Sequence, residues 1–154
     1  MMSFKDSVIT CVKIKAFTVR GRAMRSEYWW FALFYLIVGM VAYILNIVVP
    51  IVGPIIYAVI SLLLFIFSFT AGVRRLHDLN RSGWWLVSPY VLALLAVAAM
   101  LFSLLSASTV MMSIGAFLCF ASAAAFLVLF IMMMFKGTRG PNRFGEDPLD
   151  SFLK

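Results

Sequence analysis

The sequence predicts an all-α membrane protein with four transmembrane helices arranged as two helical hairpins. The chain is 64% hydrophobic and 12% charged, whereas a soluble domain is about 45–50% apolar and about 25% charged. No Asp, Glu, Lys, Arg or His occurs in residues 28–73 or in residues 84–135. A single crossing needs about 20 residues, so each of these runs must fold back on itself within the membrane.

Proline, glycine and small polar residues mark the two turns. "PIVGP" at residues 50–54 interrupts the first run, and "SLLSAST" at residues 103–109 interrupts the second. We therefore expect a transmembrane domain over residues 28–135, preceded by an arm at residues 1–27 and followed by a tail at residues 136–154. The spans are expected at about 28–49, 55–73, 84–105 and 110–135.

The arm has a partly amphipathic pattern. Phe4, Val8, Cys11, Val12 and Val19 fall roughly on one side of a helix, and lysines border that side. A basic helix with one apolar face lies in the plane of a membrane surface. The pattern therefore favours an interfacial helix in the arm.

The charges predict the orientation of the chain in the membrane. All 13 Lys and Arg residues lie in the arm, in the loop between the two uncharged runs or in the tail, and none lies in either hairpin turn. Positively charged segments stay in the cytoplasm, so we expect both termini there. The net charge of +7 then attracts anionic lipid headgroups, each nearby Lys or Arg adding about 1 kcal/mol. Anionic membrane lipids are the expected partners. A nucleic-acid partner is not expected, because a basic inner face is ordinary in membrane proteins.

Aromatic residues begin the first and third spans. The first span starts with Tyr28, Trp29 and Trp30, and the third span starts with Trp84 and Trp85. Tyrosine and tryptophan are enriched at the membrane–water interface, where an apolar ring and a polar edge are both accommodated. We predict that these five residues are interface anchors.

The stretch "RRLHDLNRSGWW", residues 74–85, has two interpretations. Arginines at the end of a span are stabilised by the helix dipole and extend towards the headgroups, which is a structural role. Guanidinium groups also match phosphate geometry, which favours an anion-binding site. In the arm, Arg22 and Arg25 are three residues apart and would share a face on a helix. The predicted ligand-binding set, from all three charged segments, is Arg22, Arg25, Arg74, Arg75, His77, Asp78, Arg81, Asn142 and Arg143.

Other functions have weaker support in the sequence. His77 and Asp78 suggest an enzyme acting on lipid headgroups, but adjacent helical residues do not face each other, so no catalytic residue is assigned. One histidine and two distant cysteines predict neither a metal site nor a cofactor. The spans contain no Asp, Glu, Lys, Arg or His, which argues against ion-coupled transport. A small oligomeric channel or transport subunit remains an alternative, and a homo-oligomer is left open.

Three motifs give the chain a family resemblance. "VRGRAMRSEYWWF", "RRLHDLNRSGWW" and "GPNRFGEDP" occur in this order, and together they resemble the domain of unknown function 805 family of small bacterial inner-membrane proteins. The resemblance covers essentially the whole chain. It implies four spans and a location in the bacterial inner membrane, but it supplies no activity, substrate or catalytic residue.

Overall fold

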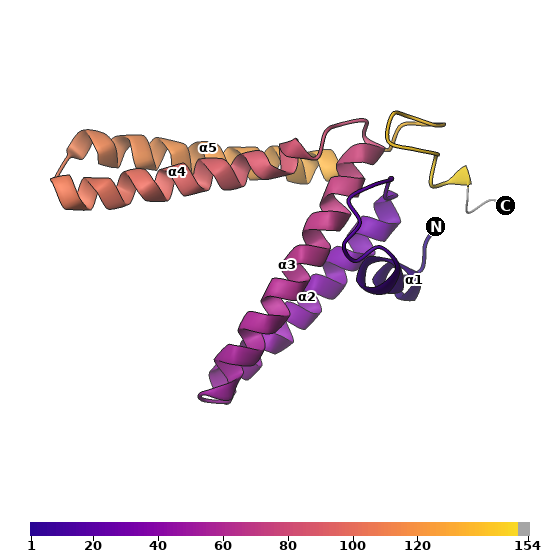
Figure 1. Ribbon diagram of the computed structural model, residues 1–154, viewed down its shortest axis with the longest axis horizontal. Helices are drawn as coiled ribbons and strands as arrows, with labels where there is room; N and C mark the ends of the chain where they lie inside the picture. The colour runs from indigo at the N-terminus through magenta and orange to yellow at the C-terminus, as the bar shows by residue number, and fades with distance from the viewer. Residues whose placement is uncertain (151–154) are drawn as a thin grey trace. The chain divides into compact units, whose positions relative to one another are not determined.

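The computed structural model describes residues 1–150 and divides the chain into two units (Figure 1). The first unit comprises Met1–Arg81 together with the tail from Lys136, and the second comprises Ser82–Phe135. Each unit is built on one pair of long helices, α2 with α3 and α4 with α5. All four helices are long and apolar enough to cross a membrane. The predicted all-α class and the two hairpins are therefore confirmed, while the predicted tail extends four residues beyond the described range.

The first hairpin consists of α2, Arg25–Val48, and α3, Val52–Asp78. Its turn is tight, because the amide of Val52 bonds the carbonyl oxygen of Pro50 at 2.8 Å. Ile51 between them has a φ of 69°, the strained backbone of a γ-turn with positive φ. Pro54, expected in the turn, instead lies in the first turn of α3, where a missing amide proton costs no hydrogen bond.

The far end of α3 extends five residues beyond the predicted span and contains Arg74–Asp78 as helix. The helix ends in a Schellman motif. The amide of Arg81 bonds the carbonyl of Leu76, and the amide of Asn80 bonds that of His77. Asn80 has a φ of 55°, a left-handed conformation that asparagine tolerates better than most residues. The charged motif is thus mostly helix, closed by an asparagine turn.

The arm forms a short helix that packs beside the first hairpin. It begins as α1, Phe4–Ile9, capped by the Ser3 side chain, and continues as the π-helix η1, Thr10–Ile14. Cys11 packs with Phe31 of α2 and Ala71 of α3 in a buried apolar cluster. The expected arm helix is therefore present, but it ends before Val19.

The second unit is the hairpin of α4, Trp84–Ser106, and α5, Thr109–Met134. Pro89 lies inside α4 and leaves the carbonyl of Trp85 without its helical donor. The hydroxyl of Ser88 bonds that carbonyl at 2.9 Å, which replaces the lost bond. Ser122 of α5 bonds the carbonyl of Pro89 at 2.8 Å and joins the two helices.

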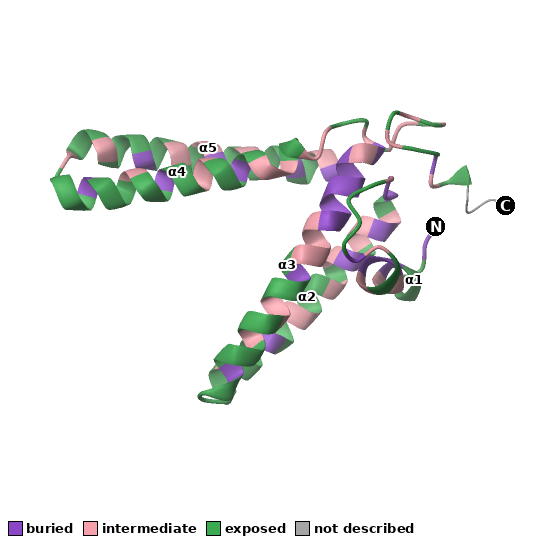
Figure 2. Ribbon diagram, viewed as in Figure 1, coloured by how far each residue is buried: buried purple, intermediate pink, exposed green. Residues whose placement is uncertain are grey.

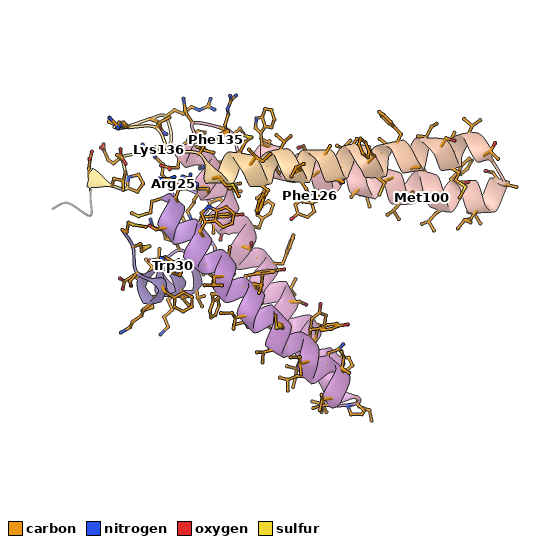
Figure 3. The ribbon with its side chains drawn as sticks, turned by 180° about the vertical axis from the view of Figure 1, so that it is seen from behind. Arg25, Trp30, Met100, Phe126, Phe135 and Lys136 are labelled. Atoms are coloured by element: carbon orange, nitrogen blue, oxygen red, sulfur yellow. The ribbon has the colours of Figure 1, made fainter. Side chains whose placement is uncertain are left out.

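Burial differs strongly along the first unit (Figure 2). Its buried residues gather where α3 ends, while the spanning parts of both hairpins are largely exposed. Apolar side chains project from these helices on all sides (Figure 3). Exposed apolar surface of this extent is stable only in lipid, whereas the buried end holds charged groups.

Candidate functional site

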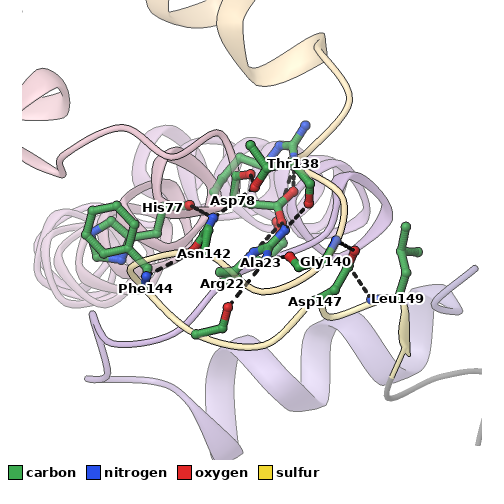
Figure 4. Close-up of polar contacts among 12 residues, drawn as sticks. Arg22, Ala23, His77, Asp78, Thr138, Gly140, Asn142, Phe144, Asp147 and Leu149 are labelled. Carbon is green, nitrogen blue, oxygen red and sulfur yellow. Dashed lines mark hydrogen bonds and ion pairs between the residues drawn. The ribbon is translucent and has the colours of Figure 1, made fainter.

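Charged and polar groups from three distant parts of the chain meet at the C-terminal end of α3 (Figure 4). We call this region the polar cap and define it as Glu27 together with residues 21–23 of the arm, 74–81 of α3 and its end, and 137–147 of the tail. The last carbonyls of a helix have no partner within the helix and need one from elsewhere. The polar cap supplies those partners.

Asp78 is the centre of the polar cap. One carboxylate oxygen accepts a hydrogen bond from Nε of Arg22 at 3.0 Å and forms an ion pair with Nη2 of the same residue at 2.9 Å. The other carboxylate oxygen forms an ion pair with Arg75. All three residues are buried, Asp78 being 3% exposed. A buried carboxylate is stable only when its charge and its acceptor positions are satisfied. Two guanidinium groups meet that requirement here.

Arg22 also holds the tail. Its guanidinium group donates to the carbonyl oxygen of Gly140 at 2.6 Å and to that of Thr138. The arginine therefore connects the arm, the end of α3 and the tail through one planar group. Fixed guanidinium geometry suits such multiple recognition better than a lysine ammonium would.

The tail crosses directly over the Asp78 carboxylate. A Cβ at Gly137 would overlap that carboxylate, so only glycine fits at this crossing. The next residue, Thr138, bonds the carbonyl oxygen of Asp78 through its amide at 2.9 Å and its hydroxyl at 3.1 Å.

Asn142 bonds the carbonyl oxygen of His77 at 3.0 Å, and Arg143 bonds that of Asn80 at 3.1 Å. The tail thus caps the C-terminus of α3.

A third buried ion pair lies one helical turn deeper. Arg74, which is 0% exposed, pairs with Glu27 in the first turn of α2. Cys11 of η1 lies against both partners, 4.0 Å from the Glu27 carboxylate and 3.7 Å from the Arg74 guanidinium. Burial, with the nearby Glu27 charge, raises the pKa of the Cys11 thiol to about 11. The thiol is therefore protonated and unreactive near neutral pH.

His77 and Asp78 bond different partners. The His77 ring stacks on Phe144 with 3.9 Å between centroids, and its Nδ1 lies 3.2 Å from the carbonyl oxygen of Gly21. Both oxygens of the Asp78 carboxylate pair with arginines. The arrangement orients the histidine by the arm and the tail rather than by the adjacent carboxylate, so it is not a carboxylate–histidine pair for acid–base chemistry.

Asp147 joins two described parts of the tail, at Gly140 and Leu149. Its carboxylate accepts hydrogen bonds from the amide of Leu149 at 3.0 Å and from that of Gly140 at 2.9 Å. The bond from Leu149, with a smaller contribution from that of Gly140, lowers the pKa of the Asp147 carboxyl below its ordinary value. The folded tail therefore favours the ionised form of this carboxylate.

The predicted ligand-binding residues fall into three groups. Arg22 and Arg25 do not share a face, because α2 begins only at Arg25 and Arg22 turns inward. Among the predicted residues, the ones that face outward are arginines at the start of α2, in the loop after α3 and in the tail. Buried are Arg22, Arg74, Arg75 and Asp78; half-buried are His77 and Asn142; exposed are Arg25, Arg81 and Arg143.

The aromatic anchors differ in exposure. Trp84 and Trp85 in the second unit are exposed, and Trp30 is 39% exposed while its ring contacts Phe4 of the arm. Trp30 lies along α2 beyond Arg25, as Figure 3 labels them. Tyr28 instead packs against the buried cluster around Cys11. The anchoring role of all five residues stays a prediction.

The sequence analysis did not identify several residues of the polar cap. Gly137 and Thr138 lack any distinctive pattern, since their role depends on a crossing with α3. Cys11 is a single cysteine, and nothing near it in sequence indicates a buried ion pair. The sequence does favour a partner for Glu27 in residues 74–85, because Glu27 is too close to Arg25 to be its helical neighbour, and that partner is Arg74.

Comparisons with known proteins agree with the motifs. The family described as "Protein of unknown function (DUF805)" matches residues 16–146. Inner membrane protein YhaI of Escherichia coli (strain K12) is 30% identical over 128 residues, which is 83% of this chain and 83% of that protein. Inner membrane protein YhaH of the same organism is 29% identical over 136 residues, covering 84% and 85%. No solved structure matches the chain.

Proposed function

The chain belongs to the DUF805 family of proteins of unknown function and is a multi-pass protein of the bacterial inner membrane, and we propose that the exposed cations of its first unit bind anionic lipid headgroups. This role needs no chemical turnover. The ligand is defined by its chemistry, a phosphate-bearing headgroup presented at the membrane surface.

The charge exposed at the surface of the described residues carries the proposal. Glu27 and Asp78 are paired inside the polar cap and contribute no negative charge to the surface. Within residues 1–150, three carboxylates are exposed, namely Asp6, Glu146 and Asp150. The exposed cations are Lys5, Lys13, Arg20, Arg25, Arg81, Lys136, Arg139 and Arg143. A surface with this excess attracts anionic headgroups by about 1 kcal/mol for each nearby Lys or Arg.

Burial assigns different roles to the arginines of the predicted site. Arg22, Arg74 and Arg75 are held by carboxylates and build the scaffold. Arg25, Arg81 and Arg143 are exposed on the same unit. Arg143 is held in place by the carbonyl of Asn80 and by the Phe144 ring, 4.7 Å from its guanidinium carbon. We assign headgroup binding to these three exposed arginines.

The proposal places both termini in the cytoplasm. The support is the distribution of Lys and Arg, which avoids both hairpin turns. Single cysteines introduced at Asp150 and at Ile51 would test it in intact cells and in opened cells. A membrane-impermeant thiol reagent is expected to label the Ile51 position from the outside of the inner membrane, and the Asp150 position only after the cells are opened.

Native mass spectrometry of the full chain tests headgroup binding. The protein is released from membranes containing phosphatidylglycerol and phosphatidylethanolamine, and retained lipids are identified by mass. We expect the wild type to retain phosphatidylglycerol. The triple variant Arg25→Ala, Arg81→Ala, Arg143→Ala is expected to lose most of it, because phosphate contacts depend on these side chains.

The matched control replaces the same three arginines by lysine. Lysine keeps the charge but loses the planar pair of donors. Retention by the lysine variant would show that charge alone suffices, whereas loss in both variants would show a need for guanidinium. If the alanine variant retained as much phosphatidylglycerol as the wild type, headgroup binding by these residues would be wrong.

A further inference from the structure

The end of η1 and the segment that joins it to the polar cap expose large apolar side chains. Ile14 is 67% exposed, Phe17 is 73% exposed and Val19 is 43% exposed. Lys13 and Arg20, both exposed, flank these residues. An exposed apolar group bordered by cations is typical of a segment that enters the boundary between headgroups and acyl chains.

The turn at residues 15–18 of this segment has a fixed position against α3. The hydroxyl of Thr70 bonds the carbonyl oxygen of Ala16 at 3.0 Å. The Phe17 ring packs edge-on against that of Phe67, with 5.9 Å between centroids. The amide of Thr18 bonds the carbonyl of Lys15 at 3.2 Å and closes the turn. The exposed side chains are therefore held by a defined structure.

The position of the turn along α3 gives its depth. Phe67 precedes Arg74 by seven residues, which is about 10 Å along a helix at 1.5 Å per residue. The α3 residues near it, such as Phe65, are exposed apolar side chains of the spanning segment. The turn thus lies beside the part of α3 that faces lipid, below the level of the buried arginines.

The start of the arm shows the same depth on α2. Phe4 contacts the rings of Trp30 and Phe34, at centroid distances of 5.9 and 6.5 Å. Phe34 follows Arg25 by nine residues, or about 13 Å of helix. Figure 1 shows the arm helix beside the first hairpin, and the rings of Phe4 before it and Phe17 after it contact apolar rings of α2 and α3.

We propose that residues 14–20 form a wedge that inserts Ile14 and Phe17 into the leaflet containing the charged end of the hairpin, with Lys13 and Arg20 on anionic phosphates. The occupant of this surface is lipid, because the wedge continues the apolar surface of α3 and its flanking charges complement anionic headgroups. The lysine and arginine stems are long enough to reach the headgroup level from this depth. The wedge deepens the proposed function. Only the role of Lys13 and Arg20 rests on headgroup binding, whereas the insertion of Ile14 and Phe17 does not.

Depth measurements with a spin label test the wedge in the full chain. The background is Cys119→Ser, which removes the exposed cysteine. Cys11 is kept, because it is buried and its raised pKa keeps it from reacting. Phe17→Cys and, separately, Ile14→Cys carry the label, and Arg139→Cys in the exposed tail is the matched control. Each protein is reconstituted in vesicles of phosphatidylethanolamine and phosphatidylglycerol, and collisions with oxygen and with a water-soluble nickel complex are compared.

The wedge predicts that labels at positions 14 and 17 collide with oxygen and are shielded from nickel, giving a ratio severalfold above that at position 139. Nickel collisions equal to those at position 139 would overturn the proposal. Shielding from both reagents would also overturn it, because a protein partner would then cover the surface. Two positions are used so that a local disturbance at Phe17 does not decide the result.

Failure of the wedge and failure of headgroup binding are distinguishable. The wedge is measured by depth, whereas headgroup binding is measured by phosphatidylglycerol retained in the Arg25, Arg81 and Arg143 variants. If the labels lie deep in the membrane but the protein retains no phosphatidylglycerol, the wedge is supported and the headgroup site is contradicted. Shallow labels in protein that retains lipid would do the reverse.

Discussion

The two hairpins are stabilised in different ways. In the first, three buried ion pairs, one to Glu27 and two to Asp78, fasten α2, α3, the arm and the tail to one another. In the second, residues 84–135 contain no ionisable side chain other than Cys119 and the phenol of Tyr90. Its helices meet through small residues and through the bond from Ser122 to the backbone of α4.

The difference shows where this fold depends on single residues. In the first hairpin, the loss of one partner leaves a buried charge, and such a loss is expensive. In the second, close packing is spread over many weak contacts, as is usual between helices in lipid. The polar end of the first hairpin should therefore be sensitive to point substitutions to which the second is tolerant.

The largest effect is expected from Arg74→Ala, which leaves Glu27 buried without its partner. We expect a loss of about 3–5 kcal/mol in the free energy of unfolding. Thermal unfolding in mild detergent measures it. The control Arg25→Ala, at an exposed arginine one turn from the same region, is expected to change stability by no more than about 0.5 kcal/mol.

A double substitution sharpens this test. Arg74→Met with Glu27→Leu removes both charges, so it should restore most of the stability lost in Arg74→Ala. If the double variant were as unstable as the single one, the damage would come from lost packing, and the contrast between the hairpins would not rest on buried charge.

Gly137→Ala should have the next largest effect. The new Cβ would overlap the Asp78 carboxylate, so the tail must shift, at about 1–3 kcal/mol for overpacking. Trypsin cleavage after Arg139 should become faster. The matched control is Gly39→Ala in α2, where a Cβ meets nothing within 4 Å, and equal behaviour of the two variants would contradict a tail held over Asp78.

Alkaline pH should destabilise the first unit through Cys11. Burial raises the pKa of this thiol from 9.0 to about 11, so between these values the folded form keeps a proton that the unfolded form has lost. Stability should therefore be unaffected below about pH 9 and fall as the pH rises towards 11. Unfolding of Cys119→Ser across this range measures the slope, and the same slope in a variant that also carries Cys11→Ser would assign it to another group.

The smallest effect is expected in the second hairpin. Ser122→Ala removes the 2.8 Å bond to the carbonyl of Pro89, and such bonds average about 0.6 kcal/mol in membranes. Ser113→Ala is the control, because that hydroxyl bonds Thr109 within its own helix. A loss at Ser122 as large as that at Arg74 would erase the proposed difference between the hairpins.

The fold was predictable from the sequence, whereas the contacts that build the polar cap were not. Uncharged runs and turn residues predict helices and hairpins because these are local properties. The left-handed Asn80 also follows from local preference. The partners of Arg22 are 56 and 118 residues away, at Asp78 and Gly140, and no spacing rule connects positions so distant. Arginines that pair with buried carboxylates and arginines that face solvent therefore look alike in the sequence.

The course of the chain through the polar cap makes the first unit discontinuous. The chain leaves it after Arg81 and returns at Lys136, and the residues near these points are close, since Gly137 touches Asp78. The second hairpin is thus an insertion between two joined ends, and a short linker in place of residues 82–135 should leave the first unit able to form. During synthesis, the cap of α3 stays incomplete until the inserted hairpin has been made, because Thr138 and Asn142 follow that hairpin in the chain.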